Sequence, residues 1–352
     1  MLLKRPVVGL FALASLAFSA DAPSFKLIRQ GGTDALDAAA SATHGHIKWS
    51  HGAFLYVDYI AGIPPYFLTL DREGKLISSA TLSMPALVRD FDRAADGSIV
   101  LAGVTSSSYG EQKPFLAWIA ADGKTERNIP MSPYYPSAIS LAPDGTLWTL
   151  GFEMINHDTH APELNPDAGV MRHYDRGGTL INWYLPQGSM AKDDFGLIQE
   201  GRLVATGDRL GWYASIGRVS KYVEISLDTM KERAYAGLPP SLSGVLGGYI
   251  EGLALTDAGD VTVCVPQRNP YAPSSYRFDR TAAKWTPLPV PSLGGYRYAP
   301  RLLGSDGEDL VFQYDQSAAF FSVVSNGAAS AVPLNPPLVL PSALLLSPPA
   351  SR

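Results

Sequence analysis

Six side chains occupy the same place in a repeated segment, each standing eight residues before a glycine. They are His44, Arg89, Ser137, Asp193, Glu251 and Ala299. Four of the six can be charged. Carboxylates such as Asp193 and Glu251 can bind a divalent metal or move a proton, while an imidazole moves protons near neutral pH and a guanidinium binds oxyanions. Any such chemistry requires that the elements carrying these residues bring them together.

The repeated segment has the pattern of a β-hairpin. In residues 137–152, SAISLAPDGTLWTLGF, an apolar run meets a Pro-Asp-Gly turn and a second apolar run, and Gly145 can take the positive φ of a hairpin corner. Five further segments share this pattern, and successive turn glycines are 45 to 58 residues apart. The turn glycines are Gly52, Gly97, Gly145, Gly201, Gly259 and Gly307.

A second pair of strands follows every hairpin, as in YFLTLDREGKLI and FLAWIAADGKTE. Four strands in each of six repeats predict an all-β fold, a six-bladed β-propeller of four-stranded antiparallel blades over residues 44–334. A single blade cannot bury both of its faces, so the core is expected between neighbouring blades. A pair of β-sandwiches is the alternative fold.

The two ends of the chain differ from the repeats. Residues 1–19 combine Lys4 and Arg5 with an apolar run and small residues, which predicts a cleavable signal peptide and a secreted or periplasmic protein. An uncleaved membrane anchor is the alternative for this segment. Residues 20–43 form an extension in which residues 25–29 are expected to add a closing strand. The tail, residues 335–352, contains five prolines and cannot form a membrane helix, so no membrane span is expected in the mature protein.

Composition excludes several classes of function. The net charge is −5 and no basic stripe is present, so the chain is not expected to bind nucleic acid. Cys264 is the only cysteine, which rules out an intrachain disulfide. The chain has no G-x-S-x-G elbow and no Walker loop, so a standard serine hydrolase or a nucleotide-binding function is unsupported.

Blade phrases such as LAPDGTLWTLG and EGLALTDAGDVTVCV resemble the six-bladed propellers of the NHL-repeat, streptogramin-lyase and gluconolactonase-like group, over residues 45–334. For a gluconolactonase-like enzyme the resemblance implies a divalent metal such as Ca²⁺, held at the channel rim by a Glu and by Asn or Asp side chains. Glu251 matches the acidic residue of that family, and Asp193 is a candidate for a second ligand. Arg89, Ser137 and Ala299 depart from the family pattern, and Arg89 would oppose a cation.

Two other interpretations of this ring of residues remain open. In one, Arg89 pairs with Asp193 or Glu251 across the channel mouth and forms a charge-balanced plug. In the other, Arg89 binds a carboxylate or phosphate group of a ligand, and His44 and Glu251 exchange protons with that ligand.

Long connections between the second and third strands of several blades are expected on the same face as the ring. They span residues 105–113, 153–169, 208–220 and 266–275. We call this side of the propeller the long-loop face. Four aromatic residues in these connections could supply flat area for a sugar ring or a partner protein: Tyr109, Trp212, Tyr213 and Tyr271.

The sequence therefore favours an exported, non-catalytic propeller that binds a partner protein or a saccharide through its long-loop face, without a cofactor. The alternative is an enzyme at the channel mouth, a metal-dependent lactonase-like hydrolase or a lyase. That enzyme would use Asp193 and Glu251 as metal ligands or acid/base groups, with His44 and Arg89 assisting.

Overall fold

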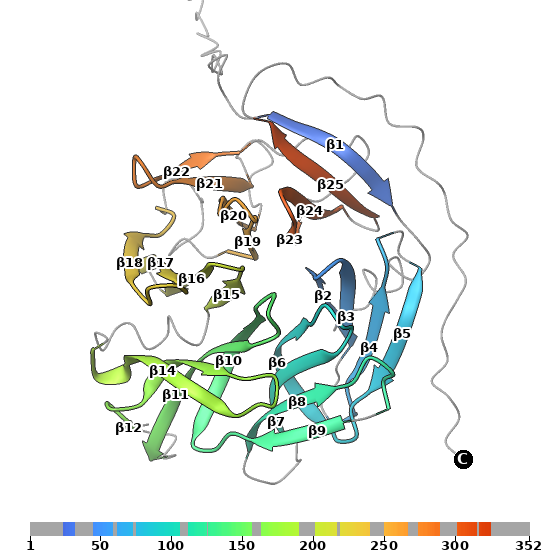
Figure 1. Ribbon diagram of the computed structural model, residues 1–352, viewed down its shortest axis with the longest axis vertical. Helices are drawn as coiled ribbons and strands as arrows, with labels where there is room; N and C mark the ends of the chain where they lie inside the picture. The colour runs from blue at the N-terminus through green and yellow to red at the C-terminus, as the bar shows by residue number, and fades with distance from the viewer. Residues whose placement is uncertain are drawn as a thin grey trace, which may run out of the picture.

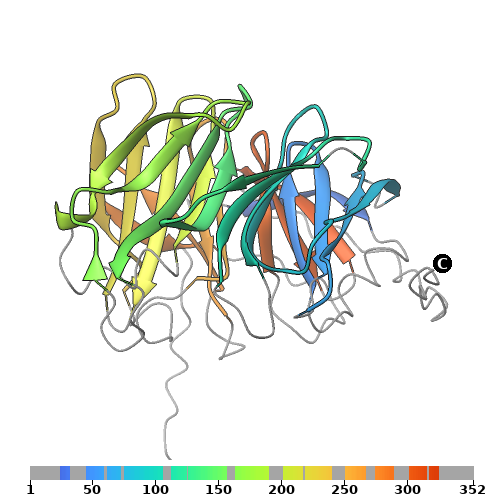
Figure 2. The same ribbon diagram turned by 90° about the horizontal axis from the view of Figure 1, so that it is seen from below.

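The described strands form separate sheets that are arranged around a central channel (Figure 1). The computed structural model describes residues 24–31, 45–58, 62–72, 75–105, 112–124, 126–156, 163–189, 201–216, 219–239, 250–266, 274–288, 301–314 and 317–324. Figure 1 shows the sheets as a ring seen along its axis, and Figure 2 shows the same ring from the side. The predicted all-β propeller of four-stranded antiparallel blades is confirmed. No helix in the described ranges is long and apolar enough to cross a bilayer.

The first three blades use strands that follow one another along the chain, with the first strand of each nearest the centre (Figure 1). Blade three carries one additional short strand, β12, which pairs with β11, and a 3-10 turn, η1 (Gln187–Ser189). The strands are β2 (Gly45–Ser50), β3 (Ala53–Asp58), β4 (Tyr66–Leu70) and β5 (Leu76–Thr81); β6 (Ala86–Arg93), β7 (Ile99–Thr105), β8 (Pro114–Ile119) and β9 (Glu126–Pro130); and β10 (Tyr134–Leu141), β11 (Leu147–Asn156), β12 (Glu163–Leu164), β13 (Gly169–Tyr174) and β14 (Leu180–Pro186).

Blades four to six repeat this order, and the last one takes its outer strand from the beginning of the chain. The strands are β15 (Arg202–Ala205), β16 (Arg209–Ile216), β17 (Val219–Ser226) and β18 (Glu232–Ala236); β19 (Gly252–Leu255), β20 (Val261–Cys264), β21 (Ser275–Asp279) and β22 (Lys284–Pro287); and β23 (Arg301–Asp306), β24 (Asp309–Tyr314), β25 (Ser317–Val324) and β1 (Ser24–Gly31).

The predicted closing strand is confirmed. β1 pairs antiparallel with β25, from Ser24 opposite Val324 to Gly31 opposite Ala318. It takes the outer place of blade six, for which the four-strand repeat predicts a strand after β25. Residues 325–334, the signal segment 1–19 and the tail 335–352 lie outside the described residues.

The core lies between neighbouring blades, because each strand sends alternate side chains to its two faces. In β16, Leu210, Trp212 and Ala214 belong to the cluster shared with blade three, which includes Trp148. Tyr213, between them, belongs to the cluster shared with blade five. Further clusters join blades one and two, two and three, and one and six. This arrangement follows the expectation that one blade alone cannot bury both faces.

Blade four differs from the prediction. Gly201 was expected to form its first hairpin turn, but it precedes β15, and β15 pairs with β16 from Arg202 opposite Tyr213 to Ala205 opposite Leu210. The turn therefore lies at residues 206–208. The predicted long loop 208–220 is wrong for the same reason. Most of it is β16, whose described side chains from Leu210 onward are buried on both faces of the sheet.

Candidate functional site

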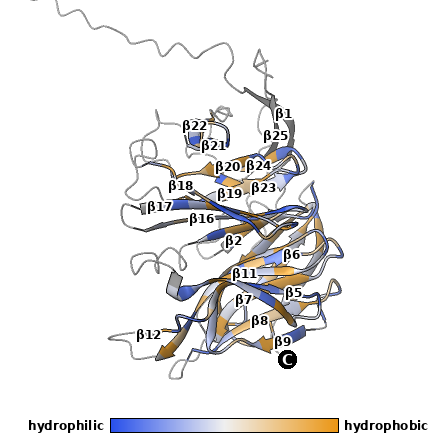
Figure 3. Cartoon of the chain, turned by 60° about the vertical axis from the view of Figure 1, so that its left-hand side comes forward, coloured by the Kyte–Doolittle hydropathy of each residue, from blue (hydrophilic) through white to orange (hydrophobic). Residues whose placement is uncertain are grey.

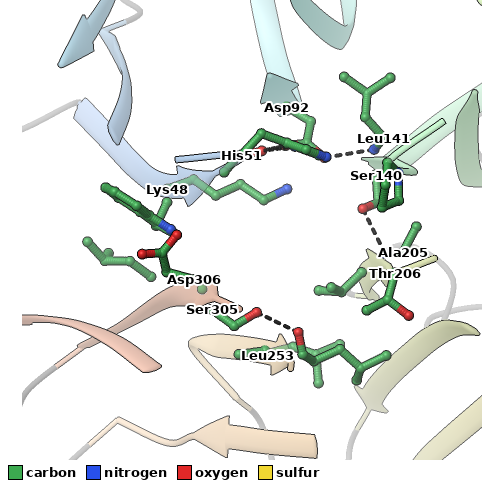
Figure 4. A pocket seen from close by; sticks show the side chains of 18 of the residues that line it. Lys48, His51, Asp92, Ser140, Leu141, Ala205, Thr206, Leu253, Ser305 and Asp306 are labelled. Atoms are coloured by element: carbon green, nitrogen blue, oxygen red, sulfur yellow. Dashed lines mark hydrogen bonds between the residues drawn. The ribbon is translucent and has the colours of Figure 1, made fainter. Parts of the chain in front are cut away.

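A cavity of about 230 Å³ lies in the central channel, where the six inner strands end and their first turns begin. All six blades line it, so it is enclosed by the ring as a whole. Figure 4 shows Lys48 of blade one extending toward its centre. The polar side chains of the lining include Lys48, Ser50, Asp92, Ser140, Thr206 and Ser305.

Two aspartates of β6 accept hydrogen bonds from backbone N–H groups at the unpaired edge of the neighbouring inner strand, β10. The Asp90 and Asp92 carboxylates accept hydrogen bonds from the backbone N–H groups of Ile139 and Leu141, both at 2.8 Å. Residues two apart in a strand share a face, so the two side chains match two N–H groups spaced in the same way on β10. Asp92 is only 3% exposed, and it also accepts from the Arg93 N–H at 2.9 Å. These carboxylates thus stand in for a missing partner strand.

Side-chain hydrogen bonds also join other pairs of neighbouring blades. Lys48 of blade one donates to the Phe91 carbonyl at 3.2 Å, and Ser50 donates to the Asp92 carboxylate. Ser140 of blade three accepts from the Ala205 N–H at 2.9 Å (Figure 4), and Ser305 of blade six donates to the Leu255 carbonyl. Most polar side chains in the cavity are therefore engaged in holding blades together.

Lys48 remains a cation in this setting. Burial alone would lower the pKa of its ammonium group, but the carboxylates of Asp90 and Asp92 raise it, and the balance lies above the ordinary value. The Lys48 Nζ lies 3.7 Å from the Asp90 Oδ1. The centre of the channel therefore holds an ammonium group paired with two carboxylates.

The predicted ring lies at the other end of the inner strands, and half of it is described. Arg89 and Ser137 each occupy a β-bulge, which confirms that the two positions are equivalent. Arg89 is exposed and forms no ion pair with another described residue. Ser137 donates to the Leu150 carbonyl at 3.1 Å, and half-buried Glu251 donates its N–H to the Cys264 carbonyl at 2.7 Å.

The remaining ring residues, His44, Asp193 and Ala299, lie outside the described residues. Asp193 also loses its positional argument, because the position was counted from Gly201, which does not form the hairpin turn of blade four. The predicted Arg89–Glu251 pairing is not formed, since a bulge turns Arg89 toward solvent. The described residues contain no group of three His, Cys, Asp or Glu side chains placed to hold a metal.

The predicted aromatic surface is wrong for two of its four members. Trp212 is 5% exposed and Tyr213 is fully buried, since both belong to β16 and point into opposite inter-blade cores. Tyr213 instead accepts a hydrogen bond from the Leu238 N–H at 2.9 Å. Tyr109 and Tyr271 lie outside the described residues.

The channel residues of the inner strands were not among the predicted site residues. A signal for them is present in GHIKWS and RDFD, where His46, Lys48 and Ser50, and then Asp90 and Asp92, recur at every second position. Residues two apart in a strand lie on the same face of the sheet. Polar residues at every second position of an innermost strand therefore indicate that this face contacts a neighbouring blade or the channel.

A second feature is an arm on blade three, formed by the distal end of β11 and by β12. Met154 pairs with Leu164 and Asn156 with Glu163, so part of the predicted loop 153–169 is a strand. Ile155 is 59% exposed on this arm. Tyr135 and Phe152 stack at its base with ring centroids 5.6 Å apart. Figure 3 shows β11 and β12 at the edge of the propeller, with hydrophobic colour at the end of β11.

The base of this arm is held by a half-buried polar network around Glu153. Its carboxylate binds the Arg172 guanidinium at 2.5 Å and accepts from the Asn165 amide at 2.7 Å. The Gln187 side chain binds both backbone groups of Glu153, at 2.9 and 3.0 Å. Arg172 in turn lies 3.8 Å from the centre of the Tyr134 ring. The orientation of the arm is therefore fixed.

The fold and the channel define the class of this chain as a β-propeller of four-stranded antiparallel blades, closed by a strand from the N-terminal region. A presumed exported protein of Bacteroides fragilis aligns with a TM-score of 0.50 and 11% identity, over 87% of this chain and 96% of its own. A luciferin-regenerating enzyme gives a TM-score of 0.48 at 13% identity, covering 87% and 98%. A chain of a nidogen/laminin complex gives 0.47 at 12%, covering 74% and 85%.

Sequence comparison adds no family to this structural likeness. No family model matches the chain, and no curated protein matches it. At these identities the likeness to solved structures shows the fold alone. The specific resemblance to the NHL-repeat, streptogramin-lyase and gluconolactonase-like group stays a prediction.

Proposed function

We propose that this chain is an exported, non-catalytic propeller that binds a partner protein through the arm of blade three on its long-loop face. The observation that carries the proposal is Ile155, a large apolar side chain that is 59% exposed on an arm with a fixed orientation. Export is supported by the charged and apolar pattern of residues 1–19.

The arm has the properties of a prepared contact surface. The Glu153 network orders β11 before any partner arrives, so less conformational entropy is lost on binding. Blade three has three more exposed apolar side chains on β14, where Leu180, Ile181 and Trp183 are 43%, 54% and 43% exposed, and the strand register places them toward the opposite end of the blade from the arm.

The chemistry of the channel favours binding over hydrolysis. A general base needs a carboxylate that can accept a proton from substrate or water. Asp90 and Asp92 already accept backbone and side-chain donors that hold blades one, two and three together. Protonating them would weaken those contacts, so their arrangement serves the ring.

The test compares two matched substitutions in the purified mature protein. Biotinylated protein would capture the partner from the exported fraction of the source cells, and the purified partner would then be titrated by biolayer interferometry. We expect Ile155→Asp to raise Kd at least tenfold, because a charge replaces a central apolar contact. Leu76→Asp, at a 52% exposed leucine on blade one, should leave Kd unchanged.

Equal affinity of Ile155→Asp and the unchanged protein would contradict the proposal. A glycan array on the same variants covers the saccharide prediction. Glycan binding that survives Ile155→Asp, with no protein partner captured, would replace the proposed partner protein by a saccharide bound elsewhere.

A further inference from the structure

Residues at the starts of three inner strands bring cationic and polar side chains to one mouth of the channel. β15 of blade four begins with Arg202, β23 of blade six begins with Arg301, and His46 is the second residue of β2 in blade one. Figure 1 shows these strands around the centre of the ring. All inner strands start at the same end of the channel, so their first residues surround one opening.

Arg202 and Arg301 are exceptional among the half-buried arginines of the described ranges. The other six bind a carboxylate or a backbone carbonyl: Arg72, Arg93, Arg172, Arg209, Arg277 and Arg280. Neither the Arg202 nor the Arg301 guanidinium group forms a hydrogen bond or ion pair with another described residue, although both residues are half-buried. The guanidinium nitrogens of Arg202 and Arg301 are not among the described buried atoms that lack a hydrogen-bond partner, so they stay open to an acceptor that a ligand supplies.

The two guanidinium groups also act on the same neighbours. Burial, Arg301 and Arg202 together lower the pKa of His46, whereas Asp90 raises it. Arg202 likewise acts on the Lys48 ammonium from the other side of the ring. These effects reach across the channel, so the charges of blades one, four and six face a shared space.

The negative groups near this mouth do not cancel the arginines. Asp90 is bound by Lys48 at 3.7 Å and by the Ile139 N–H at 2.8 Å. Glu251 stands on blade five and forms no ion pair with Arg202 or Arg301. Its charge and that of Arg301 both reach the Cys264 thiol, whose pKa burial raises to about 11. The mouth therefore holds two guanidinium groups without an acceptor among the described residues.

We infer that this mouth is a binding site for a small oxyanion, a phosphate or carboxylate group held between Arg202 and Arg301. A guanidinium offers two parallel N–H donors to such a group, and partial burial strengthens the interaction relative to water. The site is separate from the arm of blade three, so it stands whether or not the arm binds a protein.

Thermal unfolding of the purified mature protein tests this site. Inorganic phosphate and succinate would be titrated separately, at constant ionic strength adjusted with sodium chloride. We expect a saturable rise in the midpoint with one of the two anions, because a ligand that binds only the folded state stabilises it by mass action. The anion that acts at the lower concentration identifies the ligand as a phosphate or as a carboxylate.

Three variants locate the effect. Arg202→Gln and Arg301→Gln should each raise the apparent Kd of that anion at least tenfold, whereas Arg89→Gln, at an exposed arginine of the predicted ring, should not change it. In chloride alone, Arg202→Gln should raise the midpoint, since it removes repulsion from Lys48; an arginine with a purely structural role would lower it.

Two results would overturn the site. One is the absence of a saturable shift with either anion in the unchanged protein. The other is a shift that Arg202→Gln and Arg301→Gln both retain. Isothermal titration calorimetry of the unchanged protein with the same anions gives an answer even if a glutamine variant does not fold.

Discussion

At the scale of single residues, the channel is held by side chains that replace a missing strand. An innermost strand has an edge whose N–H and C=O groups have no partner within its own sheet. Asp90 and Asp92 supply acceptors for β10, and Ser140 supplies one for β15. In the sequence these residues are recognisable only as polar residues at alternate positions of otherwise apolar strands.

Asp92→Ala tests this role. The substitution leaves the buried Leu141 N–H without its acceptor and removes the bond from Ser50, so we expect a loss of about 2–3 kcal/mol of unfolding free energy. Urea denaturation measures it. Asp167→Ala, at an exposed residue, should change stability by less than about 0.5 kcal/mol. A loss that small for Asp92→Ala would show that the inner edges do not need these acceptors.

His173 gives stability a dependence on pH. It stacks on Trp148 with centroids 4.0 Å apart, and its Nε2 is buried without a hydrogen bond. Burial lowers the pKa of His173 below its ordinary value of 6.5, while Asp144 raises it by less. The folded protein therefore binds fewer protons than the unfolded chain as the pH falls through 6.5, and stability decreases toward acid.

His173→Phe should reduce this dependence, because the stacked ring stays and the titrating group is removed. Urea midpoints at pH 7.5 and 5.5 make the comparison. The difference between the two midpoints should be smaller in His173→Phe than in the unchanged protein. Identical pH dependence in both proteins would show that His173 does not contribute.

At the scale of elements, the repeat predicted the blades well and failed where two signals compete. The segment QEGRLVATGDRL offers Gly201 and Gly207 as turns, and the repeat length did not decide between them. The pairing of β15 with β16 selects the second, because residues 210–215 must bury both faces. The bulges at Arg89 and Ser137 were equally hidden, since an inserted residue has no sequence mark of its own.

The closing strand is the element whose removal should matter most. Without β1, the edge of β25 loses its partner and blade six loses its outer strand. A chain beginning at residue 32 should unfold about 10 °C below a chain beginning at residue 24, which corresponds to several kcal/mol at this size. Differential scanning calorimetry of the two chains decides this. Equal midpoints would mean that the ring closes without β1.

At the scale of the whole molecule, exposed apolar surface is concentrated on two of the blades. The large exposed hydrophobic side chains of the described residues all belong to blades one and three: Ile63, Tyr66, Leu76, Ile77, Ile155, Leu180, Ile181 and Trp183. Only on blade three does this surface include an arm held by a polar network. The sequence pointed to the long-loop face through aromatic residues, two of which the structure buries, while Ile155 carried no distinctive signal.

The affinity of the captured partner for Ile155→Asp, compared with its affinity for Leu76→Asp, decides whether the arm of blade three is the binding surface. If blade three is the binding surface, Ile155→Asp raises Kd at least tenfold while Leu76→Asp leaves it unchanged. If both variants bind as tightly as the unchanged protein, the arm is not the binding surface and the proposed function is wrong.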